Sequence, residues 1–233
     1  MREPRSARPA RAVRRVTVSV DVVLLAMHGP QLAVLLRRRT DSTMREGWEL
    51  PWEMLRQADT LTTAAARVAR TALGARPALL EQVAAFGERR RHPGKAELSV
   101  AYLALADVLP AAPAYGITTW APVRGLPALP PAQRGIVQAA LAAARDRLDR
   151  SPVAFRLLPP AFTLSELQAV YEVLLGRQLH KASFRRALRA AGLVEPTSEW
   201  RSEGRGRPAQ LYRYAPRAHR GPRRGVRLEG LSR

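Results

Sequence analysis

The stretch from Gly47 to Ala75, GWELPWEMLRQADTLTTAAARVARTALGA, places the strongest constraint on how this chain folds. Residues Trp48 to Pro51 predict a short strand, and a loop follows it. From Thr62 to Leu73 small and apolar side chains alternate with polar ones in a helical pattern, and Gly74 stands where a helix C-cap is expected. The stretch therefore predicts a strand, a loop and a helix in direct succession.

This succession resembles a Nudix box, the strand-loop-helix that holds metal and pyrophosphate in Nudix hydrolases. The matching residues are Leu50 and Pro51, Leu61 and the Ala64-Ala65 pair at the helix start, Arg67 at the arginine and Gly74 at the closing glycine. The departures are Trp52 and Glu53 in place of two glycines, and Val68, Thr71 and Ala72 in place of three glutamates.

The missing glutamates remove the chemistry that such a box supplies. Cation-assisted cleavage of a pyrophosphate needs several carboxylates on one helix face, because hard cations take oxygen ligands. Val68 and Ala72 have no ligand atom, and the hydroxyl of Thr71 carries no charge. Glu53 and Asp59 are isolated carboxylates, which we interpret as loop residues or a helix cap. We therefore expect a Nudix-type scaffold with no hydrolase activity and no metal.

The balance of charge points to a polyanionic partner. The 233 residues include 39 Lys and Arg against 19 Asp and Glu, which gives a net charge of +20 and a pI near 11.7. Nucleic acid is the simplest partner for such a chain. A GC-rich coding bias would explain why lysine stands only at Lys95 and Lys181. That bias does not explain the scarcity of acidic residues.

Composition also excludes several classes of protein. With 46% apolar residues the chain can bury a core, and without cysteine it has neither a disulfide framework nor a thiolate metal site. Its apolar runs are too short for a membrane span, and no signal-peptide core follows the basic N-terminus. The expected location is the cytoplasm, with no membrane partner.

Residues 16–150 are predicted to form an α/β sandwich of Nudix type. Its strands are expected within Val16 to Leu25, Gln31 to Arg37, Trp48 to Pro51, Leu79 to Arg89, Ala96 to Ala106 and Trp120 to Val123, with helices from Thr62 to Leu73 and from Pro131 to about Arg150. Residues 1–15 are a basic arm, expected to be disordered alone, and residues 151–161, with three prolines, are expected to be a linker. Residues 217–233 form a basic tail.

Residues 162–216 have the pattern of a winged helix-turn-helix. A capping box at Thr163 to Glu166 starts one helix, and a second helix starts near Ala182 or Ser183, with Phe184, Leu188 and Ala191 expected to face inward. A turn-rich stretch, Glu199 to Arg207, and a strand over Ala209 to Tyr214 predict a wing. The first residues of such a second helix reach base edges in the major groove.

The predicted DNA contacts are basic or polar residues on the second helix, the wing tip and the N-terminal arm. They are Lys181, Ser183, Arg185, Arg186 and Arg189 of the helix, Arg205 and Arg207 of the wing tip, and Arg14 and Arg15 of the arm. Taken singly, each arginine is equally well explained as a solvated charge. The combination of a basic helix with a basic wing tip favours DNA binding.

The order of the two domains resembles the NrtR family, the Nudix-related transcriptional regulators of bacterial NAD metabolism. The similar segments are FTLSELQAVYEVLLGRQLHKASFRRAL, GLVE and GRGRPAQLYRY in the second domain, and SVAYLALAD and TTWAPV in the first. The resemblance implies a homodimeric repressor that binds a double-stranded DNA operator. It also implies a Nudix-like domain that senses a nucleotide such as ADP-ribose, with no required cofactor, and control of NAD-related genes.

Two departures from the family pattern bear on the effector. The Arg-Asp-Pro-Arg segment of the family is matched here only by Arg91 and Pro93, and the bulk of Trp52 fills space near the box. A pyrophosphate bound without metal needs arginines to neutralise it. The expected ligand residues are therefore Arg39, Arg67 and Arg91, with Trp48 or Phe86 stacking on the adenine. Packing in the core is the alternative role of Trp48.

Other functions are open at this point. One is a Nudix-type pyrophosphohydrolase whose altered metal site uses Glu53, Asp59 or Glu97. Another is a regulator whose Nudix domain serves only as a dimerisation scaffold. A protein that coats nucleic acid without sequence preference would use the charge but would not explain an ordered winged helix.

Overall fold

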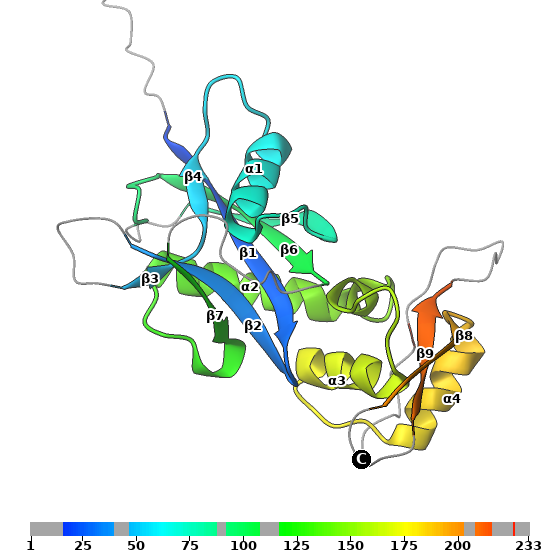
Figure 1. Ribbon diagram of the computed structural model, residues 1–233. Coiled ribbons are helices and arrows are strands. Elements are labelled where there is room, and N and C mark those ends of the chain that lie inside the picture. Colours follow the sequence, from blue (N-terminus) through cyan, green and yellow to red (C-terminus); the bar gives the residue numbers. More distant parts are fainter. Residues whose placement is uncertain are drawn as a thin grey trace, which may run out of the picture.

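The chain folds into a mixed β-sheet between helices, followed by a small helical unit with its own two-stranded sheet (Figure 1). The computed structural model describes residues 16–39, 47–87, 92–107, 117–202, 208–215 and 226. The strands are β1 (Val18–His28), β2 (Gln31–Arg38), β3 (Trp48–Glu49), β4 (Trp52–Met54), β5 (Leu79–Phe86), β6 (Leu98–Ala106), β7 (Thr118–Pro122), β8 (Val194–Arg201) and β9 (Ala209–Tyr214). The helices are α1 (Leu61–Leu73), α2 (Pro131–Asp146), α3 (Leu164–Leu175) and α4 (Lys181–Ala191), with 3-10 turns η1 (Val123–Gly125) and η2 (Val153–Leu157).

Strand β1 lies at the centre of the sheet in the first domain, where it pairs with β2, β4 and β6. The order across the sheet is β3-β2-β1-β6-β5, with β4 also on β1 and β7 on β2. Strands β1 and β6 run parallel, whereas the other pairs are antiparallel. The predicted hairpin of β1 and β2 is present, and β1 continues to His28. The predicted strand between Leu79 and Arg89 ends at Phe86, and residues 88–89 lie outside the described part of the chain.

Helices cover both faces of this sheet. Alternate side chains of a strand point to opposite faces. Val20, Val22 and Leu24 of β1 accordingly pack in a cluster with α1, whereas Val23 and Leu25 belong to the cluster that contains α2. Burial on both faces explains the long apolar run in β1 and in β6, whose residues from 100 to 106 are all buried. The predicted Nudix-type sandwich is therefore confirmed.

The box stretch folds as a strand-loop-helix, with one difference from the prediction. The expected strand over residues 48–51 is shorter, because β3 ends at Glu49. Leu50 and Pro51 separate β3, which pairs with β2, from a second short strand, β4, which pairs with β1 and lies in the predicted loop. Helix α1 begins at Leu61, where Thr60 and Thr63 form a reciprocal capping box. Gly74 ends the helix with φ 77°, which is the left-handed conformation that a glycine C-cap supplies.

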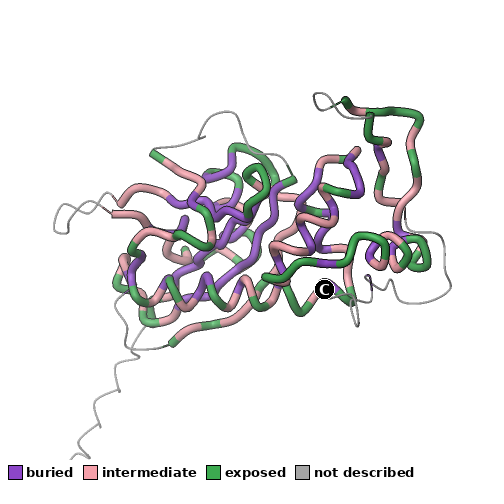
Figure 2. Tube along the Cα trace, turned by 90° about the horizontal axis from the view of Figure 1, so that it is seen from below, coloured by how far each residue is buried: buried purple, intermediate pink, exposed green. Residues whose placement is uncertain are grey.

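The segment between the domains is not a simple linker. Its apolar residues form η2, and the buried ones are Val153, Ala154, Phe155, Leu157 and Leu158. They belong to the same hydrophobic cluster as the α2 face of the sheet and the inner face of α3. The prolines that predicted a linker flank an apolar run, and that run joins the two domains in one continuous core. Figure 2 shows buried stretches of the chain in both domains.

Candidate functional site

Helix α3 is fixed at both ends by the signals that its sequence carries. The hydroxyl of Thr163 accepts a hydrogen bond from the Glu166 amide at 3.1 Å, and the Glu166 carboxylate accepts one from the Thr163 amide at 2.6 Å. Gly176 closes the helix with φ 70°. The predicted apolar stripe, Leu164, Leu167, Val170, Tyr171 and Leu174, is buried. This helix is therefore a rigid support for the one that follows.

Helix α4 packs one face on α3 and presents a cationic face to solvent. Phe184 and Leu188 are buried, and the Phe184 ring lies 5.2 Å from the ring of Tyr171. Lys181, Arg186 and Arg189 are exposed, as expected of DNA contacts. Helix α4 begins one or two residues earlier than predicted, at Lys181, where the His180 ring caps the Ser183 amide.

Other positions on α4 differ in exposure. Arg185 is only half-buried, and its Nε finds no hydrogen-bond partner among the described residues. Ser183 is also half-buried and contacts the His180 ring through its hydroxyl. Ala191 was expected to face inward but is exposed, because it lies at the last position of the helix, beyond the contact with α3.

The wing is an antiparallel pair that is tied to α3. Strand β8 continues to Arg201, so the predicted turn-rich stretch is partly strand, and Leu211 of β9 is buried as predicted. Arg201 forms an ion pair with Glu166 at 2.7 Å, which joins the wing to the start of α3. Trp200 is 56% exposed on β8, a feature that the sequence pattern did not single out. Arg205 and Arg207 lie outside the described residues, as do Arg14 and Arg15 of the arm.

The degenerate box is closed by an ion-paired arginine. Arg67 of α1 donates to Asp59 from Nη1 at 3.1 Å and from Nη2 at 2.6 Å, and it also pairs with Glu53. The hydrogen bond from Arg67 lowers the pKa of Asp59, while Asp59 and then Glu53 raise the pKa of Arg67. The two remaining carboxylates near the box are therefore neutralised by the chain itself.

A hollow of about 180 Å³ marks the place where the box glutamates would project. It is lined by Val68, Thr71 and Ala72, together with Arg37, Pro51, Trp52, Glu53 and Thr118. The guanidinium of Arg37 lies over the Trp52 ring, 5.1 Å from its centroid. Within the part of the chain that the structure describes, no three His, Cys, Asp or Glu side chains are grouped as a metal site requires.

The residues predicted to bind the effector are spread over several places. Arg39 is half-buried, with its Nε 3.9 Å from Glu49, and Trp48 packs against the main core from β3. Arg67 is held in the box, as described above. Phe86 lines a separate small pocket, and Arg91 lies outside the described residues. The described members do not share one cavity.

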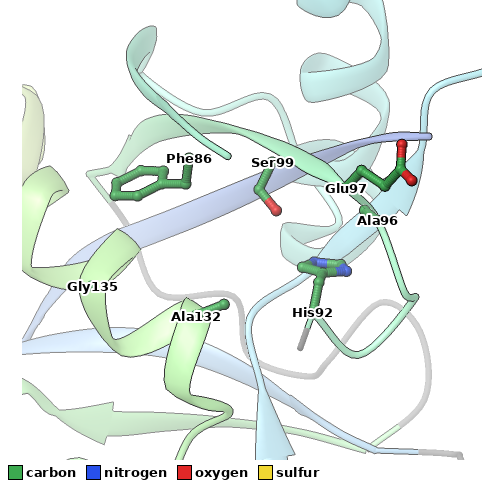
Figure 3. Close-up of a pocket in the computed structure, with 7 residues that line it drawn as sticks. All are labelled: Phe86, His92, Ala96, Glu97, Ser99, Ala132 and Gly135. Atoms are coloured by element: carbon green, nitrogen blue, oxygen red, sulfur yellow. The ribbon is translucent and has the colours of Figure 1, made fainter. Parts of the chain in front are cut away.

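The pocket at Phe86 lies between the sheet and α2. It has a volume of about 60 Å³ and is lined by Phe86, His92, Ala96, Glu97, Ser99, Ala132 and Gly135. Figure 3 shows Phe86 and Ser99 on the sheet side, Ala132 and Gly135 on α2, and the Glu97 carboxylate pointing away from the others. His92 and Ser99 are the polar groups that this pocket shares with a buried network.

That network is centred on Asp21, which is fully buried in β1. Its carboxylate accepts from the Ser19 hydroxyl at 2.8 Å, from Gln133 Nε2 at 3.1 Å, and contacts His92 Nε2 at 2.9 Å. The Gly94 amide donates to His92 Nδ1 at 3.1 Å, so Nε2 carries the ring proton and donates to Asp21. The Ser99 hydroxyl lies 3.0 Å from the Ser19 oxygen and donates to it, because Ser19 gives its single proton to Asp21.

Sequence reasoning missed this network. Ser19 and Asp21 interrupt an otherwise apolar strand, and that was the available signal. Gln133 extends the network to the box stretch, because its Oε1 accepts a hydrogen bond from the Leu50 amide at 2.8 Å. One buried carboxylate thus joins β1, the loop at His92, the start of α2 and the strand end of the box.

No helix in the described part of the chain is long and apolar enough to cross a membrane.

Family models match both halves of the chain. Residues 15–139 match the NUDIX domain, and residues 154–214 match the NrtR DNA-binding winged helix domain. The ADPR responsive transcriptional repressor NtrR of Acinetobacter baylyi is 32% identical over 209 residues, which cover 85% of this chain and 82% of that protein.

Solved structures resemble the whole chain as well. The crystal structure of Shewanella oneidensis NrtR in complex with a 27mer DNA superposes with a TM-score of 0.75 at 29% identity, covering 90% of this chain and 98% of that one. A MutT/nudix family protein from Enterococcus faecalis has a TM-score of 0.69 at 20% identity, covering 87% and 89% of the two chains, and shows a shared fold. Each similarity extends across the Nudix-like domain and the winged helix together.

Proposed function

Because the chain belongs to the NrtR family, we propose that it is a DNA-binding transcriptional repressor whose Nudix-like domain responds to ADP-ribose or a related nucleotide. One observation carries the proposal: α4 locks its apolar face on α3 and turns Lys181, Arg186 and Arg189 outward. A helix anchored in this way can enter the major groove as a rigid body. The Shewanella oneidensis relative in complex with DNA has the same two-domain order.

The operator is double-stranded DNA, and we infer that a homodimer binds it. A symmetric dimer reads two half-sites about one helical turn, or a multiple of one turn, apart. Arginine contacts to phosphates supply affinity that falls steeply with salt, whereas contacts to base edges supply specificity. The basic arm and the wing tip would add contacts at the edges of the site. Such a repressor acts in the compartment that holds the DNA, which supports the cytoplasm as its location.

The ADPR-responsive relative supports ADP-ribose as the effector. We propose NAD-related genes as the targets, on the family resemblance alone. We place the effector on the Nudix-like domain and retain Arg39, Trp48, Arg67, Phe86 and Arg91 as its candidate contacts. The pocket at Phe86 measures about 60 Å³. Ligand pockets commonly measure about 300 to 1,000 Å³, so this one can take only part of a nucleotide. The rest of the ligand must lie on the neighbouring surface.

We infer that the Nudix-like domain binds without hydrolysing. Val68, Thr71 and Ala72 offer no carboxylate to a cation, and Glu53 and Asp59 are engaged by Arg67. Glu97, the third carboxylate that an altered metal site could use, lines a different pocket. A hydrolase with an altered metal site would have to break the Arg67 ion pairs first. A Nudix domain that serves only for dimerisation would leave repression insensitive to every nucleotide.

The test is a gel shift of the full chain on its own promoter region, with and without ADP-ribose and NAD. We expect specific binding that ADP-ribose releases, and no nucleoside monophosphate formed from ADP-ribose in the presence of magnesium or manganese. Specific binding that no nucleotide changes would support the dimerisation scaffold. Metal-dependent hydrolysis without specific DNA binding would support the pyrophosphohydrolase instead.

A further inference from the structure

A third cleft lies at the boundary between the two domains. It is separate from the pocket at Phe86 and from the hollow lined by Val68, Thr71 and Ala72. It has a volume of about 500 Å³, against about 60 and 180 Å³ for the other two. This size falls within the range of about 300 to 1,000 Å³ that small-molecule sites occupy, and domain boundaries are where such sites concentrate. Its walls come from the β1–β2 turn, from β7 and η1, from α2, and from the end of α3 with the turn that follows.

The chemistry of the cleft is that of a site for an organic anion. Leu32, Leu141 and Val173 contribute apolar surface, and Arg124, Arg145 and Arg177 contribute three guanidinium groups. Glu172 is the one acidic residue among the described residues of the lining, and its Oε1 already accepts from the Leu179 amide at 2.9 Å and from Gln168 Nε2 at 2.9 Å. Positive charge beside apolar surface fits a ligand with a phosphate or carboxylate at one end and a ring at the other.

The three arginines of the cleft differ in their hydrogen-bond and ion-pair partners. Arg145 of α2 donates from Nε to the Leu174 carbonyl at 2.6 Å, so it spans the seam and offsets the partial negative charge at the end of α3. Arg124 and Arg177 are exposed, and no carboxylate among the described residues pairs with either. Two exposed cations that line one cleft, and that no described carboxylate pairs with, are available to a ligand anion.

We propose that this cleft binds a small organic phosphate with an aromatic ring, at a site distinct from the effector site of the Nudix-like domain. Its phosphate lies between Arg124 and Arg177, and its ring lies against Leu141 and Val173. The proposal requires no ADP-ribose response and no DNA binding. A ligand in the cleft would nevertheless contact the turn that precedes the DNA-binding helix, because residues 176–178 lie a few residues before the start of α4 at Lys181.

The probe is adenosine 5′-monophosphate (AMP), titrated by calorimetry into the full chain, with adenosine as the ligand that lacks the phosphate. We expect AMP to bind, adenosine to bind far more weakly, and the double variant Arg124→Ala/Arg177→Ala to weaken AMP binding by roughly tenfold or more. The matched control is Arg70→Ala/Arg76→Ala, which removes the same charge from exposed positions in and after α1. That control should change AMP affinity by less than about twofold.

Amide hydrogen exchange locates the ligand independently. AMP should protect the peptides that cover residues 30–36 and 172–180, which include two parts of the cleft lining. Three results would overturn the proposal: no AMP binding by the wild-type chain, equal AMP affinity in the double variant, or protection confined to α1 and the strands of the Nudix-like domain. A double variant that changes the molar mass in light scattering but not AMP affinity would assign the cleft to contact with a second copy.

The response to ADP-ribose keeps the two hypotheses apart. The double variant should still release DNA when ADP-ribose is added, because its substitutions lie outside the Phe86 pocket and the hollow at Val68, Thr71 and Ala72. Loss of AMP binding with a normal ADP-ribose response supports a second site. A wild-type chain that binds AMP in the cleft but ignores ADP-ribose would contradict the proposed function and leave the cleft proposal intact.

Discussion

Arg186 is the residue of α4 whose loss should most change DNA recognition. A helix turns about 100° per residue, so Arg186 points about 180° away from the midpoint of the buried pair Phe184 and Leu188. The side chain is exposed, and no described carboxylate pairs with it. It stands in the second turn of the helix, close to the end that enters the groove first.

The size of the effect follows from what a guanidinium does at a base edge. A bidentate contact to guanine contributes about 1–3 kcal/mol of discrimination, so Arg186→Ala should raise the Kd for the operator by about 5- to 150-fold. Arg189 lies further along the helix, where a phosphate contact is expected. Arg189→Ala should weaken specific and nonspecific binding alike and reduce the slope of log K against log salt by about 1.

The assay is fluorescence anisotropy on the operator duplex and on a scrambled duplex, over a series of salt concentrations. Both substitutions place alanine at exposed helix positions, where it is the best helix former, so circular dichroism should show an intact fold. Arg76→Ala removes an equal charge far from α4 and serves as the control. Operator affinity that is equal for wild type, Arg186→Ala and Arg189→Ala would refute the assignment of α4 as the recognition helix.

Three further predictions concern stability and pH. Asp21→Ala leaves three buried hydrogen-bond donors without their acceptor and should cost about 3–5 kcal/mol in urea unfolding, whereas Asp21→Asn, which keeps the shape and one acceptor oxygen, should cost less; equal losses would contradict the role of hydrogen-bond acceptance at this position. Thr163→Ala removes the cap of α3 and should cost about 1 kcal/mol in the same assay, with Thr163→Ser retaining most of the stability. The pKa of Asp59 is lowered in the folded state, so its contribution to stability is present above the unfolded pKa of about 3.9 and is lost as pH falls through the lower folded value. Acid titration of Arg67→Met should lack this component, and an unchanged titration would show that the ion pair does not stabilise the fold.

The winged helix could be predicted closely because its signals are local. The capping box at Thr163 lies within four residues, and the helix ends at Gly176 and Gly192 need only a residue that tolerates positive φ. The error at Ala191 has a different origin. Helical periodicity continues to the end of a helix, whereas contact with α3 stops at Leu188, the last buried residue of α4.

Features that depend on distant parts of the chain were beyond the sequence pattern. His92 and Asp21 are 71 residues apart, and Gln133 is 112 residues from Asp21, so their contact exists only once the sheet and α2 have assembled. The core of η2 was missed for a related reason. Prolines in a sequence indicate irregular backbone, but they do not say whether the residues between them, such as Phe155, are buried.

Helix α2 connects the surroundings of the Phe86 pocket to the DNA-binding helices. Its first turn carries Gln133, which hydrogen-bonds Asp21 beside the Phe86 pocket, and its last turn carries Arg145, which hydrogen-bonds the Leu174 carbonyl at the end of α3. The two residues are twelve positions apart along the helix, a span of about 18 Å. The face of α2 between them is part of the core that continues through η2 into α3, and a close-packed core resists local deformation. A ligand that favours one position of the α2 start therefore also favours one position of α3, and it shifts DNA affinity only by the difference in its own affinity for those two arrangements.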